Sequence, residues 1–211
     1  MAGLSFGSVK GSAKKEKAES YKMVDGDNSV RLYGNILPRY VYWIKGTNGK
    51  NLPFECLEFS RDTESFDKAE KDWVKEFYPD LKCGWSYSMM CLDNGVPKIF
   101  NFKKKLFDQI MANIDDLGDP ADLDNGWVLK FSKKKTGPLP INVEYTLQTV
   151  KCLNSKGPAS EADREAIAAS KTIEELLPRA TPEAQKELLE KLQSGDADTI
   201  DESVEDELNV Q

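Results

Sequence analysis

The chain contains no histidine, and this absence removes whole classes of chemistry. Without an imidazole, neither a Ser-His-Asp triad nor a Cys-His pair can form. The four cysteines, Cys56, Cys83, Cys91 and Cys152, are irregularly spaced and include no C-x-x-C pair, so neither a zinc ribbon nor a disulfide framework is predicted. Buried, reduced thiols are the simpler interpretation. We expect a protein that is not an enzyme and that uses no metal and no cofactor.

Long apolar runs are also missing. No segment approaches the ~18 consecutive apolar residues of a membrane span, and the first residues lack the apolar stretch of a signal peptide. We therefore expect a cytoplasmic protein. Its 211 residues, with 39% apolar content, suggest one globular core with additional segments.

Acidic and basic residues are unevenly distributed along the chain. Residues 1–150 hold 22 lysines and arginines against 21 acids, a net charge of +1, whereas residues 151–211 hold 7 against 15, a net charge of −8. The overall net charge of −7 therefore reflects the C-terminal part alone. It does not argue against a nucleic-acid ligand for the first part.

Aromatic residues and lysines lie side by side in two short stretches, residues 98–105 and 127–135. Single-stranded nucleic acid presents phosphates that attract cations and base faces that stack on flat rings. The combination predicts stoichiometric binding of a single strand. Three of the lysines, residues 103–105, open a predicted helix, where the helix dipole disfavours cations and a bound phosphate would relieve the repulsion.

Hydrophobic periodicity predicts a β-rich fold. Alternating patterns and turn residues predict strands at 29–33, 39–45, 82–92, 98–102, 127–132 and 141–150. Helical spacing predicts helices at 65–78 with Ser65 as N-cap, from 103 onward, and at 161–170, 172–177 and 181–193. The leucines of the last helix, Leu188, Leu189 and Leu192, dock either on a partner or on the core. This pattern indicates a mainly β fold with helices: an OB-type Greek-key barrel core, short C-terminal helices and a disordered acidic tail.

Composition divides the chain into four parts. We expect a flexible basic N-terminal arm at 1–20, a single-strand-binding core at 21–153, a helical C-terminal segment at 154–195 and an acidic disordered tail at 196–211. Such a tail can present apolar anchors within negative charge to partner proteins, or fold back on a basic cleft and compete with nucleic acid. A tail that only solubilises the protein is the alternative.

Three segments resemble the single-stranded DNA-binding, helix-destabilising proteins of tailed bacteriophages, the gene 32 class. They are the opening Lys22–Leu32, the aromatic strand and lysine-opened helix within Gly95–Ile110, and the strand Trp127–Phe131 with the Gly137 that follows it. Together they cover roughly residues 20–150 in motif order.

Two departures from that family limit what the resemblance implies. The best-known members hold zinc in a Cys/His ribbon, and residues 65–78 offer no suitable ligands at the corresponding place, so the zinc is not expected here. The family also often places further aromatic residues after the final glycine, where this chain has Pro138-Leu139-Pro140-Ile141.

The resemblance implies sequence-nonspecific binding and protection of single-stranded DNA in phage replication, recombination and repair, in the host cytoplasm. It implies a basic arm for cooperative self-association and an acidic tail that recruits replication or recombination proteins. The predicted DNA-binding residues are Tyr40, Tyr42, Trp43, Lys45, Lys82, Trp85, Tyr87, Lys98, Phe100, Phe102, Lys103, Lys104, Lys105, Lys130, Lys133, Lys134 and Lys135. The predicted partner-binding residues are Asp201, Glu202, Glu205, Asp206, Glu207 and Leu208.

Two other functions fit the same sequence. A protein-binding adaptor or scaffold would use the helical C-terminal region, and its lysines would only solubilise it. A nuclease would need carboxylates for magnesium, but the acidic candidates lie in turn contexts where aspartate is expected anyway. These candidates are Asp93, Asp115, Asp116, Asp119, Asp122 and Asp124.

Overall fold

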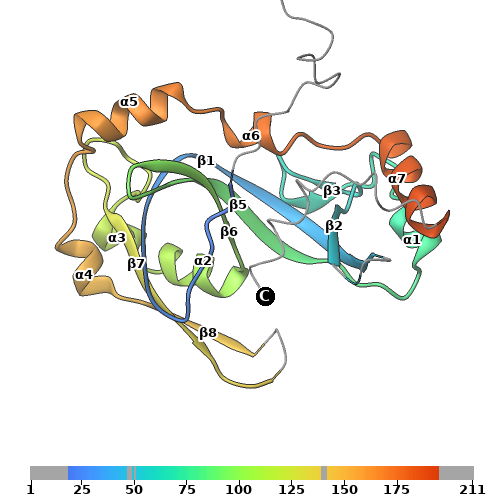
Figure 1. Ribbon diagram of the computed structural model, residues 1–211, viewed down its shortest axis with the longest axis horizontal. Coiled ribbons are helices and arrows are strands. Elements are labelled where there is room, and N and C mark those ends of the chain that lie inside the picture. Colours follow the sequence, from blue (N-terminus) through green and yellow to red (C-terminus); the bar gives the residue numbers. More distant parts are fainter. Residues whose placement is uncertain (1–18, 47–48, 50, 139–141, 195–211) are drawn as a thin grey trace, which may run out of the picture.

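The computed structural model describes residues 19–46, 49, 51–138 and 142–194, and they form a mainly β structure (Figure 1). Within these residues, six strands make one antiparallel sheet in the order β6-β5-β1-β7-β8, with β2 paired to β1, while β3 and β4 form a small separate sheet. The strands are β1 (Gly26–Lys45), β2 (Asn51–Glu55), β3 (Phe59–Ser60), β4 (Ser65–Phe66), β5 (Gly84–Asp93), β6 (Val96–Phe102), β7 (Val128–Lys135) and β8 (Val143–Leu147). The helices are α1 (Val74–Phe77), α2 (Lys104–Met111), α3 (Ile114–Leu117), α4 (Thr149–Leu153), α5 (Glu161–Ala169), α6 (Ile173–Leu176) and α7 (Pro182–Ser194).

Strand β1 is continuous where the sequence predicts two strands separated by Pro38. Its pairing with β5 shifts between Tyr33 and Leu37. Gly34 lies within this shift at φ +73°, a backbone conformation that favours glycine. Pro38 follows directly after the irregularity, where the missing N–H interrupts the ladder least. The proline therefore marks a bend within one strand and not the end of a strand.

The strands predicted at 82–92 and 98–102 are confirmed, and they form a hairpin. Strands β5 and β6 pair up to Asp93 and Val96, which leaves a two-residue turn. Asn94 and Gly95 both have positive φ, 51° and 79°, as a type I′ hairpin turn requires.

The main core lies inside the curve of the sheet, next to α2 (Figure 1). Trp127, Leu129 and Phe131, which the alternation of β7 places on one face, are all fully buried there. Helix α2 begins directly after β6, as predicted, and buries Leu106 and Ile110 against this core. The short helix α3 begins three residues after the end of α2.

The last two strands differ in extent from the prediction. The lysines of residues 133–135 continue β7 and do not form a turn. Strand β8 ends at Leu147, and α4 begins two residues later. On the side of β8 that faces α2, the side chain of Gln109 takes the place of a neighbouring strand: its Nε2 donates to the carbonyl of Tyr145, and its Oε1 accepts from the N–H of Leu147, both at 2.8 Å.

The prediction of a helix at residues 65–78, with Ser65 as its N-cap, is wrong. Ser65 pairs with Ser60 in the small sheet, and Lys68 has φ +55°, which no α-helix contains. A single helical turn begins only at Val74, whose N–H donates to the carboxylate of Asp72 at 3.0 Å. Tertiary contacts of the small sheet override the local helical pattern.

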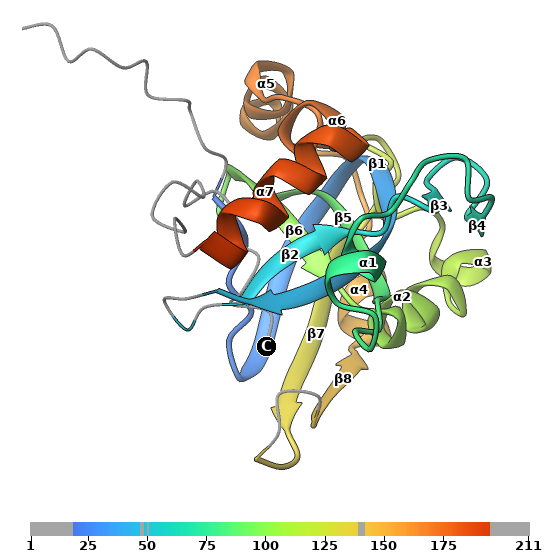
Figure 2. The ribbon, with the colours of Figure 1, turned by 90° about the vertical axis from the view of Figure 1, so that its right-hand side faces the viewer.

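The C-terminal helices α5, α6 and α7 form where they are predicted. The hydroxyls of Ser160 and Thr172 cap α5 and α6, and Thr181 Oγ1 accepts from the N–H of Ala184 in the first turn of α7. Leu189 of α7 is buried in a second core with residues of β1, β2 and α1, and α7 lies beside that end of the sheet (Figure 2). The leucines of α7 thus dock on the core. None of the described helices is long and apolar enough to cross a membrane.

The contact between Gln109 and β8 generates a prediction. Replacing Gln109 with Met keeps the side-chain length but leaves a carbonyl and an N–H of β8 without these partners, which costs about 1 to 3 kcal/mol in the free energy of unfolding. Urea unfolding followed by circular dichroism measures this cost. Gln148 is the matched control, because its side chain makes an exposed hydrogen bond to Asp27. Equal losses for Gln109→Met and Gln148→Met would contradict the edge-closing role.

Candidate nucleic-acid interface

Five aromatic rings form a row from the small sheet to α2, which we call the aromatic row. The ring of Phe66 lies 4.8 Å from that of Tyr40, measured between ring centroids, and Tyr40 lies 4.4 Å from Trp85. Trp85 stacks on Tyr87 at 5.4 Å, and Tyr87 stacks on Phe107 at 4.1 Å. Phe66 is 47% exposed. Tyr40, Trp85 and Phe107 are partly exposed, so the row offers ring surface to a ligand.

The strand register explains how residues distant in sequence meet in this row. Tyr40 of β1 lies directly opposite Trp85 of β5, and Tyr87 lies two residues further on the same face of β5. Helix α2 adds Phe107, and the β3–β4 hairpin adds Phe66 from the other side. The row therefore lies where two of the three apolar cores of the described structure meet, because Trp85 packs against both of them.

A basic corner lies at the same end of β1 as Tyr40; we use this name for Trp43, Lys45, Lys82 and Lys103. Trp43 is three residues from Tyr40, so the two side chains lie on opposite faces of the strand. The ammonium group of Lys103 lies 5.0 Å from the centre of the Trp43 ring, within cation–π range. Lys45 shares a face of β1 with Trp43 and is exposed. Lys82 is exposed two residues before β5 begins.

The start of α2 brings further cations to this place. Lys103 is the N-cap residue, and within the described structure its side chain makes no capping hydrogen bond. Lys104 is paired with Asp108 at 2.8 Å on the exposed face of the helix. Burial raises the pKa of the Tyr40 hydroxyl. Lys105 is exposed on the same turn.

Four of the predicted stacking residues lie in the core. Tyr42, Tyr87, Phe100 and Phe102 are 1%, 3%, 0% and 2% exposed. A ring covered on both faces has no surface for a base, since a small sheet fills its interior with aromatic side chains first. Tyr87 contributes by supporting the rings of Trp85 and Phe107.

Two of the predicted cations, Lys98 and Lys133, make contacts within the protein. Lys98 donates to Asp93 at 2.9 Å, and this hydrogen bond raises the pKa of Lys98. Lys133 is 7% exposed and donates to the carbonyl of Met23 at 3.4 Å. Neither ammonium group projects freely toward a ligand.

The second lysine stretch stays apart from the first. Lys134 and Lys135 are exposed on β7, and Lys130 is partly exposed on the same strand. β7 pairs with the first half of β1, whereas Tyr40 and Trp43 lie in its second half. No contact between these lysines and the aromatic row occurs among the described residues. The predicted partner-binding residues, 201–208, lie outside the described residues.

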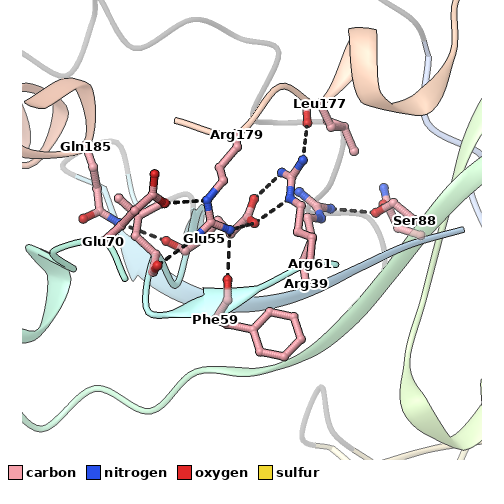
Figure 3. A network of polar contacts seen from close by, with 11 residues as sticks. Arg39, Glu55, Phe59, Arg61, Glu70, Ser88, Leu177, Arg179 and Gln185 are labelled. Carbon is pink, nitrogen blue, oxygen red and sulfur yellow. Dashed lines mark hydrogen bonds and ion pairs between the residues drawn. The ribbon is translucent and has the colours of Figure 1, made fainter. Parts of the chain in front are cut away.

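The sequence pattern does not predict three features of the structure, of which the first two belong to this site. Phe66 lies in a segment whose pattern predicts a helix, and Phe107 has the apolar spacing expected of a buried residue in the helix from 103 onward. A polar network on the sheet was also missed: Nη2 of Arg39 donates to the hydroxyl of Ser88 at 2.6 Å (Figure 3), and that hydroxyl donates to Oδ1 of Asn101 at 2.6 Å. The period-two pattern of residues 86–88 and 99–101 was the one available signal for this network.

Three of the nuclease candidates, Asp119, Asp122 and Asp124, lie in the turns that follow α3, whereas Asp93 ends β5 and Asp115 and Asp116 lie in α3. Asp119 Oδ1 accepts from the N–H of Ala121 at 2.8 Å, and Asp122 Oδ1 accepts from the N–H of Asp124 at 2.7 Å. These local bonds are the usual reason for aspartate in turns. Among the described residues, no group of three or more Cys, Asp or Glu side chains is arranged to hold a metal ion.

Comparison with known proteins adds one similarity. A probable ssDNA-binding protein of Escherichia phage T5 is 43% identical to this chain over 72 residues. These residues are 34% of this chain and 28% of the T5 protein, so the match spans about a third of this chain and less than a third of the T5 protein. No protein-family model matches the chain. The chain therefore shares one segment with a phage protein named for single-strand binding.

The basic corner predicts how the fluorescence of the chain responds to an anionic quencher. Trp43 is partly exposed beneath a lysine, so iodide will be drawn to its ring, whereas Trp127 is fully buried. We expect Trp43→Phe to lower the iodide-accessible fraction of the emission and Trp127→Phe to leave the iodide-accessible emission unchanged. Neutral acrylamide serves as the control quencher. An iodide response that is unaffected by Trp43→Phe would remove this ring from the proposed surface.

Proposed function

We propose that the chain is a sequence-nonspecific single-stranded DNA-binding protein that protects single strands in phage DNA replication, recombination and repair. The observation that carries the proposal is the aromatic row, with partly exposed rings of Tyr40, Phe66 and Trp85, together with the basic corner at the same end of β1. The similarity of one segment to the T5 protein supports the same function.

The strand arrangement supports an OB-type Greek-key core. If the segment from β2 to α1 is left out, five strands remain, and β1, β5, β6, β7 and β8 become the first to the fifth. Their order across the sheet is then third, second, first, fourth, fifth. OB folds bind oligonucleotides on the second and third strands, flanked by the loop between the first two strands. Trp85 lies on the second strand, and Phe66 lies in that first connection.

The proposed mechanism is stoichiometric and needs no reaction step. Lysines replace the counterions condensed on the phosphate chain, and the partly exposed rings stack on bases. Each stacked base contributes about 1 to 3 kcal/mol, so two or three rings suffice for useful affinity. Because duplex DNA hides its base faces, preferential binding destabilises duplexes by mass action.

We further propose that the acidic residues 196–211 recruit replication or recombination proteins in the host cytoplasm, and that residues 1–20 support cooperative self-association. The adaptor alternative is less favoured, because Leu189 and Leu192 of α7 are used in the core and are not offered to a partner.

The function is tested by titrating the tryptophan emission of the full chain with a dT oligonucleotide and with duplex of equal length at two salt concentrations. We expect salt-sensitive quenching by the single strand and a much weaker response to the duplex. If neither the full chain nor a chain truncated after Ser194 responds, masking by the acidic tail is excluded and the proposal fails.

A second test of the proposed function compares an exposed lysine with a lysine that is paired within the protein. Lys105→Ala removes an exposed cation of the proposed surface and should lower the salt slope of single-strand binding by about 0.7 for each phosphate that the variant no longer neutralises. Lys98→Ala is the matched control, because Lys98 is paired with Asp93. A slope that falls for Lys98→Ala and not for Lys105→Ala would place the interface elsewhere.

A further inference from the structure

The β3–β4 hairpin carries Phe66, the most exposed ring of the aromatic row, but has little of its own to hold it in place. Its strands pair only Phe59 with Phe66 and Ser60 with Ser65. It also belongs to a sheet separate from the main one. A two-stranded ribbon is marginal in water by itself, so the position of Phe66 depends on contacts with other elements.

Arg61 ties the end of β3 to β2. Its Nε donates to Glu55 Oε1 at 2.7 Å, and its Nη2 donates to Glu55 Oε2, which makes a two-pronged contact. Its Nη1 donates to the carbonyl of Leu177, just after α6, at 3.1 Å. The side chains of Arg61 and Glu55 are only 13% and 9% exposed. Water therefore competes little for this pair.

Arg179, between α6 and α7, contacts the start of the hairpin and a residue that follows it (Figure 3). Nη2 donates to the carbonyl of Leu57 at 2.7 Å, and Nη1 donates to the carbonyl of Phe59 at 2.9 Å. Nη1 also lies 3.2 Å from Glu55 Oε1. Beyond the hairpin, Nε donates to Glu70 Oε2 at 2.7 Å. One guanidinium thus joins the segment before Phe66 to the segment after it.

Gln185 of α7 adds a second clamp on the same excursion. Its Nε2 donates to the backbone carbonyl of Glu55 at 2.9 Å, and its Oε1 accepts from the N–H of Trp73 at 2.8 Å. Gln185 is 2% exposed. The whole excursion from 55 to 73 is therefore pinned by side chains of the C-terminal segment.

We propose that Arg179 is a positioning residue for single-strand binding: it holds Phe66 against Tyr40, so that the docking of the C-terminal segment sets the affinity of the aromatic row. The inference rests on the proposed function. Arg179 acts through the hairpin and makes no phosphate contact of its own, because its Nε, Nη1 and Nη2 donors are all directed at protein acceptors. Affinity is thereby coupled to the part of the chain that the acidic residues 196–211 directly follow in sequence.

The test compares Arg179→Met with Arg164→Met in the full chain, using dT titration at several salt concentrations. Arg164 also ties a C-terminal helix to a loop, donating to the carbonyl of Leu123 at 2.8 Å and to Asp124 at 2.5 Å, but no described contact joins it to the aromatic row. We expect about tenfold weaker binding for Arg179→Met with an unchanged salt slope, and less than about twofold change for Arg164→Met. Amide exchange should become faster in residues 57–70 of Arg179→Met.

Combining Arg179→Met with Phe66→Ala tests whether Arg179 acts through this ring. The losses in binding free energy from the two substitutions should be clearly less than additive, because Phe66→Ala removes the ring that Arg179→Met already displaces. Full additivity, a lower salt slope or wild-type affinity for Arg179→Met would each overturn the inference. If Arg179→Met does not fold, Glu70→Gln tests the same clamp, with a smaller loss expected and an unchanged affinity counting against it. A wild-type chain that binds no strand would overturn the proposed function instead.

Discussion

Strand β1 is the constraint on which the rest of the structure depends. It pairs with β5, β7 and β2, so every strand of the main sheet except β6 and β8 hydrogen-bonds to it directly. Its residues Val30 and Leu32 belong to the first core, and Tyr42 and Ile44 belong to the second. The bend near Gly34 separates the two halves of β1, so that each half contributes to a different one of these two cores.

The position of the candidate site follows from that bend. Where the two cores meet, neither can cover the rings between them completely, and Tyr40 and Trp85 remain partly exposed at this junction. The small sheet covers part of the gap with Phe66 and leaves nearly half of that ring exposed. The aromatic row is therefore a consequence of how the cores join, and the lysines at the start of α2 lie beside it because α2 follows β6 without a loop.

Local patterns in the sequence predicted the elements that local physics determines. The Asn94-Gly95 turn, the start of α2 and the capped C-terminal helices are all set by residues close in sequence. The structure of residues 65–78, including the position of Phe66, depends instead on Arg179, which is more than a hundred residues away in sequence. Hydrophobic periodicity carries no information about such a contact. Likewise, alternation showed that Phe100 and Trp85 lie on strands, but burial of one and exposure of the other depend on which elements pack above them.

Arginines and lysines have different roles in this structure, and the difference bears on sequence specificity. All five arginines of the chain donate hydrogen bonds to protein acceptors within the described structure, among them Arg31 to the carbonyl of Gly157 and Arg39 to Ser88. Exposed positions near the proposed interface are occupied by lysines such as Lys45 and Lys105. Arginine reads bases through its rigid two-pronged geometry, whereas lysine acts as a mobile point charge on phosphates. A surface that keeps its arginines for internal clamps and presents lysines beside rings is suited to binding any single strand and to discriminating little among sequences.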